Sequence, residues 1–506
     1  MSKFSRRDFM KFTVAASGTL ALSKFIPQTS WTKINQSASL PNVLIFVFDA
    51  MSAKNLSVYG YPRKTSPNLE RFAERATVFN AHYSAGSFTT PGTASLLTGL
   101  YPWTHRAINE AGLIARDLTE RNIFKLTGED RYRVAYSQNI WPNYFFGQFQ
   151  QDIDKIISPG SFGQVDYLIG EKFDKSLQTN LRAFDDFLFQ SENPPASLVF
   201  GLIERILFRR TVTLTNQGGY PNGLPRLSDY PLYFRLQDVF DGVIKSIENL
   251  NPSYMAYFHF WPPHDPYNPT KQFYRTMDDG WSPVEKPDHP LGDHVPAKKL
   301  YSERRAYDEF IASADDEFGR LLDFLESRKI LDNSYVIVTA DHGELFERGE
   351  RGHISPLLYE AGIRIPLLIS APGQTSRQDV HTPTNSVDLL PTLVHLSGHP
   401  LPDWREGELL PVLGGQEIPG RSMYTLYALK NPAFKALFRF SVAMRKDNYK
   451  MIFYRGYYAE DHFELYDLEQ DPEELNDLYP GNPAIAVQLR EELLTKLEKV
   501  NAGYPS

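Results

Sequence analysis

Three largely apolar runs stand out in the hydrophobic pattern of the chain, and polar residues follow two of them directly. The runs occupy residues 43–48, 253–260 and 334–340. An apolar run without alternation is typical of a strand buried on both faces, as in a parallel sheet. Asp49 follows the first run, and Asp341 and His342 follow the third. Because open α/β sheets bind ligands at the carboxyl ends of their strands, these side chains are candidates for function.

Apolar residues at helical spacing lie between and after these runs. Residues 307–325 carry an apolar stripe, residues 440–454 predict a hairpin, and residues 484–500 predict a closing amphipathic helix. This order predicts an α/β fold with a mostly parallel sheet sandwiched by helices, followed by a smaller C-terminal α+β subdomain. We place the main domain at residues 39–435 and the subdomain at residues 436–506.

The stretch from Ser87 to Leu100, S-F-T-T-P-G-T-A-S-L-L-T-G-L, predicts a helix with hydroxyl groups at its N-terminus. Pro91 suits the first helical turn, and it leaves Thr89 and Thr90 beside the unpaired N–H groups of that turn. These groups and the helix dipole stabilise negative charge, so a phosphate or sulfate ester would fit there. A capped core helix without a site is the alternative interpretation.

The first residues predict export. Ser5-Arg6-Arg7-Asp8-Phe9-Met10-Lys11 precedes an apolar run, residues 12–22, that is too short for a stable membrane span. The pattern resembles the bacterial twin-arginine signal. We therefore expect the twin-arginine export machinery to recognise residues 1–38 and to carry the folded chain to the periplasm or cell envelope. A chance basic end is the alternative, and an uncleaved anchor is also open.

The amino-acid composition excludes several kinds of functional site. The 506 residues include no cysteine, which excludes disulfides, thiolate metal ligands and a cysteine nucleophile. The net charge of −8 gives no general case for nucleic-acid binding, so we expect no nucleic-acid partner. With 42% hydrophobic and 23% charged residues, the chain has the composition of an ordinary soluble globular protein.

Several motifs together resemble the sulfatase family of the alkaline-phosphatase superfamily. They are the strand from Pro41 to Asp49, Tyr59-Gly60-Tyr61-Pro62, Thr65-Ser66-Pro67-Asn68-Leu69, Leu96-Leu97-Thr98-Gly99-Leu100-Tyr101-Pro102, Asp341-His342-Gly343-Glu344 and residues 464–474. The resemblance covers most of the chain from Pro41, and its main gap is an insertion at about residues 142–251. It implies an alkaline-phosphatase-like fold and hydrolysis of an anionic ester.

The insertion is rich in Phe, Tyr and Leu, and it predicts a cationic amphipathic helix. The apolar positions of that helix are Leu198, Leu202, Ile203, Ile206 and Leu207. Such a helix could contact a membrane or a lipid substrate, or form a lid on its own domain.

The family's nucleophile motif, C/S-x-P-x-R followed by L-x-T-G, aligns with Thr89, Pro91 and the segment 96–99. The resemblance therefore implies that Thr89 is the nucleophile, with Thr90 as the fallback, and we expect no formylglycine because the usual Cys or Ser is absent. The motif arginine is replaced by Thr93, and the second Asp of the family's D-D pair is replaced by Ala50.

The resemblance also implies a divalent metal ion held by Asp49, Thr89, Asp341 and His342. Carboxylates with an imidazole suit several ions, so calcium, magnesium, manganese and zinc stay open.

The remaining site residues are assigned by the same resemblance. His264, in a segment similar to H-x-x-x-P-H-x-P-Y, is the candidate general acid because an imidazole titrates near working pH. The first His of that segment, His259, is a candidate substrate contact. His353 stands where many sulfatases have a Lys, and it is a further catalytic candidate.

Two asparagines complete the candidate substrate-binding residues. Asn139 and Trp141 replace the family's sulfate-binding Lys and His, and Asn139 keeps a polar side chain there. Asn109 lies where phosphonate monoester hydrolases carry an active-site Asn, and an exposed turn residue is the alternative.

These observations leave three hypotheses for function. The first is a metal-dependent hydrolase or transferase that uses Thr89 on phosphate esters, including diesters of envelope lipids or glycans. Lipoteichoic acid synthases and phosphoethanolamine transferases resemble this arrangement, and the loss of cationic groups favours a singly charged substrate. The second is a sulfuric ester hydrolase with an unmodified Thr. The third is a non-catalytic relative that binds anionic glycans or lipids.

Overall fold

The computed structural model describes residues 40–128, 130–162, 219–227 and 233–504. The chain from Leu40 forms one compact unit. The predicted twin-arginine segment and the predicted amphipathic helix around residues 198–207 both lie outside the described residues. Among the described residues, no helix combines the length and apolar character needed to cross a membrane.

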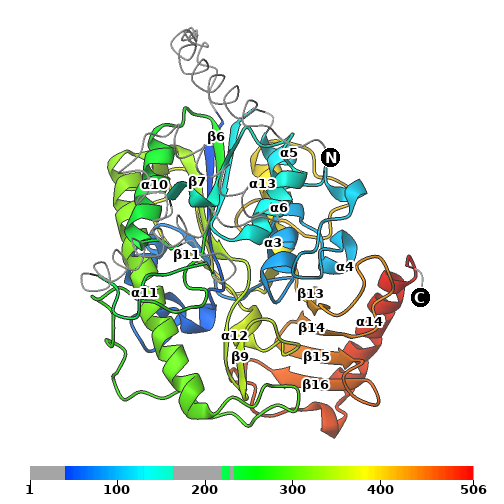
Figure 1. Cartoon of the computed structure of the whole chain (residues 1–506). Coiled ribbons are helices and arrows are strands. Elements are labelled where there is room, and N and C mark those ends of the chain that lie inside the picture. The colour runs from blue at the N-terminus through cyan, green and yellow to red at the C-terminus, as the bar shows by residue number, and fades with distance from the viewer. Residues whose placement is uncertain (1–39, 129, 163–218, 228–232, 505–506) are drawn as a thin grey trace, which may run out of the picture. The chain divides into compact units, whose positions relative to one another are not determined.

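An eight-stranded sheet forms the centre of the molecule (Figure 1). Adjacent strands are parallel except at β10, which runs antiparallel to both of its neighbours. The spatial order is β11 (Gln378–Val380), β2 (Thr77–Phe79), β10 (Leu367–Ser370), β7 (Ser334–Ala340), β1 (Asn42–Phe48), β6 (Tyr254–Phe260), β4 (Tyr132–Ser137) and β5 (Lys155–Ile157). The predicted α/β class and mostly parallel sheet are therefore confirmed.

Helices cover both faces of this sheet, and this explains the unbroken apolar runs of its central strands (Figure 1). Phe46 and Phe48 of β1 join a core with one set of helices, whereas Ile45 and Val47 join a second core on the opposite face. The first set is α2 (Pro67–Ala73), α10 (Leu236–Glu248) and α11 (Ala297–Ser327). The second set is α3 (Thr89–Thr98), α5 (Ile123–Gly128), α6 (Ile140–Gln148) and α13 (Leu389–Leu396).

Shorter elements connect the layers. They are α4 (Pro102–His105), α12 (Glu360–Ile363), the paired strands β3 (His82–Tyr83) and β12 (Thr384–Asn385), and the hairpin of β8 (Leu345–Glu347) with β9 (Glu350–Gly352). The β8–β9 hairpin directly follows the segment Asp341-His342-Gly343-Glu344 at the end of β7, so the chain returns after β9 toward that strand end.

The C-terminal part forms a separate antiparallel sheet of four strands, packed against α14 (Ala484–Asn501). The strands are β13 (Ser422–Tyr427), β14 (Phe440–Lys446), β15 (Tyr449–Arg455) and β16 (His462–Asp467). The predicted hairpin and closing helix are confirmed. This sheet begins at β13, ahead of the predicted boundary at residue 436, and the N–H of Leu426 in β13 donates to the carbonyl of Ala85.

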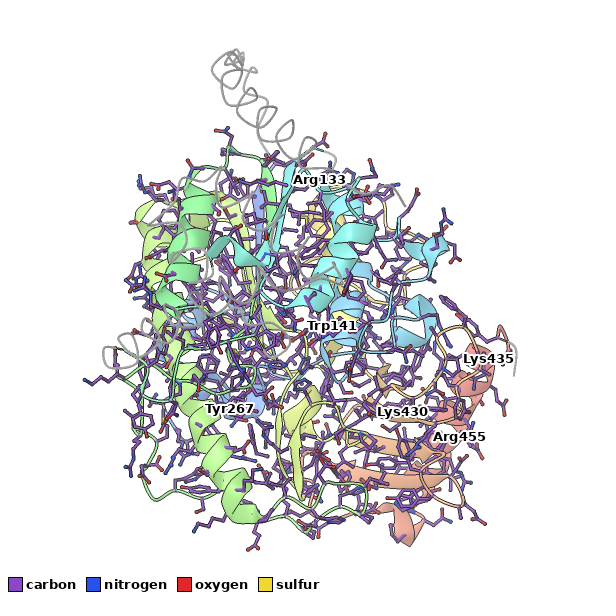
Figure 2. The ribbon with its side chains drawn as sticks, viewed as in Figure 1. Arg133, Trp141, Tyr267, Lys430, Lys435 and Arg455 are labelled. Atoms are coloured by element: carbon purple, nitrogen blue, oxygen red, sulfur yellow. The ribbon has the colours of Figure 1, made fainter. Side chains whose placement is uncertain are left out.

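The parallel strands direct several loops toward one edge of the sheet. Figure 2 shows this direction, because Arg133 lies near the start of β4 whereas Trp141 lies past its end, toward the middle of the molecule. Tyr267, in the loop after β6, also lies toward the middle of the view. The carboxyl ends of β1, β4, β6 and β7 are therefore the place where their following residues meet.

Candidate active site and metal centre

Two aspartates lie side by side at the carboxyl ends of the central strands. Phe48 of β1 is level with Ala340 of β7, so Asp49 and Asp341 each follow the last residue of their strand at the same height. His259 lies one residue before the end of β6, level with Val47. Because side chains alternate along a strand, His259 faces the α3 side of the sheet, as Val47 does.

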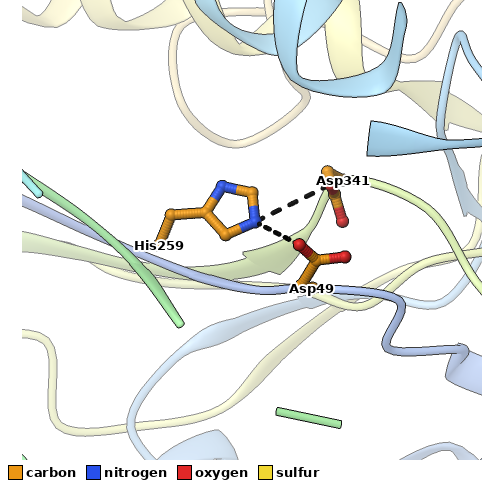
Figure 3. Close-up of side chains that lie close together, drawn as sticks. All are labelled: Asp49, His259 and Asp341. Atoms are coloured by element: carbon orange, nitrogen blue, oxygen red, sulfur yellow. Dashed lines mark hydrogen bonds and ion pairs between the residues drawn. The ribbon is translucent and has the colours of Figure 1, made fainter. Parts of the chain in front are cut away.

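These residues form a tight cluster with no exposure to solvent (Figure 3). His259 Nε2 lies 3.2 Å from Asp49 Oδ2 and 3.7 Å from Asp341 Oδ2. His342 approaches the same carboxylates, with its Nε2 3.4 Å from Asp49 Oδ1 and 3.7 Å from Asp341 Oδ2. The predicted ligands Asp49, Asp341 and His342 therefore come together, and His259 joins them.

The cluster fits a divalent metal ion. Ligand atoms of Asp49, His259 and Asp341 all lie within 4.8 Å of one another. Asp49 Oδ1 is buried and has no hydrogen-bond partner within the described part of the chain. A buried carboxylate oxygen without a donor is costly, and a cation would satisfy it. Carboxylate oxygen and imidazole nitrogen are ordinary ligands of divalent ions.

Thr89 stands beside this cluster at the first residue of α3. Its Oγ1 lies 3.3 Å from His342 Nε2 and 3.3 Å from Asn139 Nδ2. Thr90, the other predicted candidate, donates its hydroxyl to the carbonyl of Glu110 instead. Gly92 allows α3 to come close, because a Cβ at this position would lie 2.3 Å from the carbonyl oxygen of Asp341. The geometry thus brings the hydroxyl of Thr89, rather than that of Thr90, next to His342 and Asn139.

Asn139 links the nucleophile candidate to the carboxylates. Its Oδ1 accepts from the N–H of Trp141 and caps α6, which orients the amide. Its Nδ2 then donates to Asp49 Oδ2 at 2.6 Å and lies near Thr89. The structure places this predicted substrate-binding residue in the site, with an aspartate and a threonine as its contacts.

Two further histidines face the cluster from the loop after β6 and from the residue after β9. The ring of His353 lies 4.8 Å from the ring of His264 and 4.3 Å from that of His342, measured between centroids. His264 Nδ1 donates to the carbonyl of Asp265 at 2.8 Å, and His353 Nδ1 lies 3.1 Å from Glu344 Oε1. Each outer nitrogen is therefore fixed, which orients the Nε2 edge of each ring.

The charges of the site shift the pKa values of its groups. Burial lowers the pKa of His264, but Asp49, Asp265 and Glu344 outweigh burial and raise it to about 10. Burial likewise opposes the charges of Asp341 and Asp49 at His342, whose pKa rises to about 9. Burial raises the pKa of Asp49, but the charge of His264 and the proximity of the His259 and His342 imidazoles hold it well below its usual range.

A cavity of about 430 Å³ opens beside Thr89. Its lining includes both predicted catalytic histidines, His264 and His353. The other lining residues are Phe88, Glu110, Asn139, Trp141, Trp261, Asp265, Asp293, Glu350, Arg351, Gly352 and Ile354. The one guanidinium in this lining, that of Arg351, pairs with Glu303 and Asp265. The cavity is therefore aromatic and acidic around a single, already paired guanidinium.

Asn109 does not join the site. Its amide donates to the carbonyls of Leu429 at 2.7 Å and Asn431 at 3.0 Å, in the loop after β13. It is also absent from the residues that line the cavity. Its contacts are those of a residue that joins two loops, and its partly buried side chain also differs from the exposed turn residue that was the alternative.

Glu344 and Asp265 contact the catalytic candidates His353 and His264, although no role was predicted for either acid. Each fixes the outer nitrogen of one histidine, at His353 and His264 respectively. The available signal was sequence adjacency, because Glu344 closes the Asp341-His342-Gly343-Glu344 segment and Asp265 directly follows His264.

The fold and the site together define an α/β protein in which a hydroxyl nucleophile candidate adjoins a buried centre of carboxylates and imidazoles. Comparison with known proteins narrows this class. The chain belongs to the sulfatase family, because the family model "Sulfatase" matches residues 41–399. A second model, "N-sulphoglucosamine sulphohydrolase, C-terminal", matches residues 349–502. The family consists of ester hydrolases, and this chain is one of them.

Individual relatives support the same assignment. The choline-sulfatase of Rhizobium meliloti is 27% identical over 468 residues, which cover 87% of this chain and 82% of the relative. A phosphonate monoester hydrolase from Silicibacter pomeroyi has a similar fold, with a TM-score of 0.64, 18% identity and coverage of 91% and 96%. The solved structure of BT4656 in complex with its substrate D-glucosamine-2-N,6-O-disulfate also has a similar fold. Its TM-score is 0.62 at 17% identity, and the match covers 92% of this chain and 98% of that one.

Proposed function

We propose that this chain hydrolyses singly charged phosphate esters, with phosphodiesters as the preferred substrates, and that Thr89 is the nucleophile. One observation carries the proposal: Thr89 Oγ1 lies at the N-terminus of α3, 3.3 Å from His342 Nε2 and beside the cavity that His264 and His353 line. Helix N–H groups at that position stabilise the oxygens of a bound anion. The hydroxyl is thus next to the place where a phosphoryl group would bind.

The identity of the nucleophile favours phosphorus over sulfur. A sulfatase with formylglycine releases sulfate by elimination from its hydrated aldehyde, and Thr89 has no such route. A phosphorylated threonine can instead be hydrolysed by attack of water at phosphorus. The surroundings of Thr89 also favour a low substrate charge, because the cavity carries Glu350, Asp293 and Glu110 and its single guanidinium is already paired. A dianionic or polyanionic substrate would be repelled there.

The residues support a two-step reaction. Thr89 Oγ attacks phosphorus in line and releases its proton to solvent, the Oγ–P bond forms, and the bond from phosphorus to the leaving oxygen breaks. His264 donates the Nε2 proton to that oxygen, because its raised pKa keeps the ring protonated at neutral pH. In the second step neutral His264 takes a proton from water, the water oxygen forms a bond to phosphorus, the Oγ–P bond breaks, and Thr89 Oγ regains a proton from solvent. His353 is the second candidate for this proton transfer.

Asp49, Asp341 and His342 would hold the divalent ion that accompanies this chemistry. When bound, the ion supplies positive charge that neutralises an oxygen of the ester and favours the alkoxide form of Thr89. Asn139 holds Asp49 from the other side, with 2.6 Å between Nδ2 and Oδ2, and so fixes the carboxylate during turnover.

Hydrolysis of sulfuric esters by the unmodified threonine is the second candidate function. A sulfate monoester also carries one negative charge, so it satisfies the same limit on substrate charge. The similarity to a choline-sulfatase over 87% of this chain supports this candidate.

A substrate panel separates these functions. Wild type, Thr89→Ala and the matched control Thr90→Ala are assayed on aryl sulfate, aryl phosphate and bis-aryl phosphate with each divalent ion. We expect the highest kcat/KM on bis-aryl phosphate, a loss on the order of 1,000-fold in Thr89→Ala, and little change in Thr90→Ala. Intact mass after rapid quenching should show a phosphoryl adduct on Thr89.

Each other result overturns part of the proposal. The highest kcat/KM on aryl sulfate would establish the sulfatase function. Turnover in Thr89→Ala at the wild-type rate would eliminate Thr89 as the nucleophile. No turnover of any substrate with any ion would leave a protein that only binds anionic glycans or lipids.

The same proposal includes export, which would give the enzyme access to ester-containing envelope lipids or glycans. The support is the Ser5-Arg6-Arg7-Asp8-Phe9-Met10-Lys11 segment. Residues 1–38 fused to a folded reporter should export it in bacteria, and replacing both Arg6 and Arg7 with Lys should keep it in the cytoplasm. Export of the doubly substituted fusion would contradict a twin-arginine route.

A further inference from the structure

His259 occupies a position in the cluster that substrate contact does not require. It is completely buried, and its Nε2 lies between the two carboxylates, at 3.2 Å from Asp49 Oδ2 and 3.7 Å from Asp341 Oδ2. It is not among the residues that line the cavity, whereas His264 and His353 are. Figure 3 shows the ring directed at both aspartates. A substrate in the cavity would therefore meet His264 and His353 rather than His259.

The outer nitrogen of each inner imidazole has a hydrogen-bond partner of its own. His342 Nδ1 lies 2.8 Å from the carbonyl oxygen of Gly343, and a carbonyl can only accept, so Nδ1 carries a proton. His259 Nδ1 lies 3.1 Å from the Tyr257 hydroxyl, which can accept a hydrogen bond. Such partners leave Nε2 of each ring as the metal-ligating atom, the usual arrangement around a metal-bound histidine.

The carboxylates are oriented in the same manner. Asp341 Oδ1 accepts from the N–H groups of Ala50 and His342, at 3.2 Å and 3.0 Å. Its Oδ2 is the oxygen that lies between the two imidazole nitrogens. Asp49 Oδ1, close to His342, has no hydrogen-bond donor in the described residues. Ala50 contributes a backbone N–H but has no side-chain atom that could bind a metal. The further side chain that approaches both carboxylates is that of His259 in β6.

We propose that His259 is a metal ligand and that the site, composed of Asp49, Asp341, His259 and His342, selects Zn²⁺ over Ca²⁺ and Mg²⁺. Ca²⁺ takes about six to eight oxygen ligands, and Mg²⁺ also prefers oxygen. The described cluster supplies two carboxylates and two imidazoles, which matches the mixed nitrogen and oxygen ligands of Zn²⁺. This inference rests on the proposed function only in that both use the same site.

Metal binding tests the inference without any measurement of turnover. Purified wild type, stripped by a chelator, is offered Zn²⁺, Mn²⁺, Mg²⁺ and Ca²⁺ together at equal concentration, and its metal content is measured after gel filtration. We expect about one Zn²⁺ per chain, as for a single site. Co²⁺ substitution should give a visible absorption spectrum that changes when His259 is replaced.

Variants assign the ligand. His259→Ala should weaken Zn²⁺ binding by about 100-fold or more, since the loss of even an indirect contact costs about 10- to 100-fold. His259→Asp should shift the preference toward Mg²⁺ and Ca²⁺ by about tenfold or more, because it replaces nitrogen with oxygen. His264→Ala, whose ring lies in the cavity wall, is the matched control and should retain wild-type Zn²⁺ affinity.

Two results overturn the inference. One is wild-type Zn²⁺ affinity in His259→Ala, and the other is a preference of the wild type for Ca²⁺ or Mg²⁺. His259→Asn, compared with wild type by near-ultraviolet circular dichroism of the metal-free proteins, separates loss of a ligand from misfolding. If the wild type selects Zn²⁺ through His259 but hydrolyses no ester, the proposed function fails while this inference stands.

Discussion

Two buried clusters of acid and histidine in the described part of the chain differ in how their polar atoms are satisfied. In the cluster between the β8–β9 region and the C-terminal sheet, His289 Nδ1 accepts from the N–H of Leu291, and His289 Nε2 donates to Glu464 at 2.9 Å. The hydroxyls of Tyr359 and Tyr466 donate to the other oxygen of Glu464. Every polar side-chain atom of His289 and Glu464 therefore has a partner.

The cluster at Asp49 is equally buried but incomplete. Asp49 Oδ1 has no donor within the described residues, and the Nε2 atoms of His259 and His342 converge on carboxylate oxygens. Folding alone favours satisfied polar groups, as around Glu464. Burial and charge are therefore alike in the two clusters. They differ in the Asp49 oxygen that lacks a donor, and a bound cation would satisfy that oxygen.

The largest effect we predict is a loss of activity when Asp49, in the incomplete cluster, is replaced. Asp49→Asn should lower kcat/KM on the order of 1,000-fold and weaken metal binding, because it removes a charge that the site needs. The free energy of unfolding of the metal-free protein should change by less than about 1 kcal/mol, because the lost contacts of Asp49 with the imidazoles are offset by removal of a buried carboxylate that lacks a full set of donors. Steady-state kinetics and urea unfolding of the chelator-treated protein measure the two effects. A large loss of stability would show that Asp49 is structural.

The complete cluster should give the opposite result. Glu464→Ala leaves His289 and two tyrosine hydroxyls buried without their partner, so the free energy of unfolding should fall by about 3 kcal/mol. At a temperature where the variant is folded, kcat should stay within about threefold of wild type, because Glu464 is not among the residues that line the cavity. Urea unfolding measures the change in stability, and steady-state enzyme kinetics at low temperature measure kcat. A kcat loss comparable to that of Asp49→Asn would erase the distinction between the clusters.

The sequence predicted the strands that later carried the site. Residues 43–48 and 334–340 are apolar on both faces, so their pattern alone indicates buried parallel strands, and the structure has β1 and β7 there. Short strands such as β2 and β10 lack a pattern of their own, because three or four residues are too few to show a period. β13 was not predicted; it lies ahead of the boundary placed at residue 436, and its pairing with β14 spans the loop between Tyr427 and Phe440.

Those site residues that directly follow the end of a predicted strand could be predicted from the sequence. Asp49, Asp341 and His342 are such residues, and the structure brings them together. The place of His259 depends on alternation along β6 and on its register with β1, which a single sequence does not supply. Asn109 was assigned by spacing, but its amide bonds a carbonyl 320 residues away, a contact that no local pattern contains.

A smaller effect should follow from the residue that orients His353. Glu344→Gln keeps the size of the side chain but removes the negative charge beside His353 Nδ1. We expect kcat to fall about tenfold with KM within about twofold, because a less firmly held imidazole transfers protons less well while binding persists. The pH profile of kcat should shift as well, which a purely structural residue would not cause. Unchanged kcat and pH profile would show that Glu344 does not position His353.

The smallest effect concerns substrate charge at the cavity. Burial and the charge of Asp293 raise the pKa of Glu350 to about 7, although the Ser355 hydroxyl and the N–H of Arg351 oppose this. Glu350 is therefore neutral below pH 7 and negative above it, so KM for an anionic ester should rise about threefold as the pH passes through 7. Glu350→Gln should abolish this rise, and Asp293→Asn should move its midpoint to lower pH because it removes the repelling charge. The same rise in Glu350→Gln, measured with bis-aryl phosphate, would assign the titration to another group.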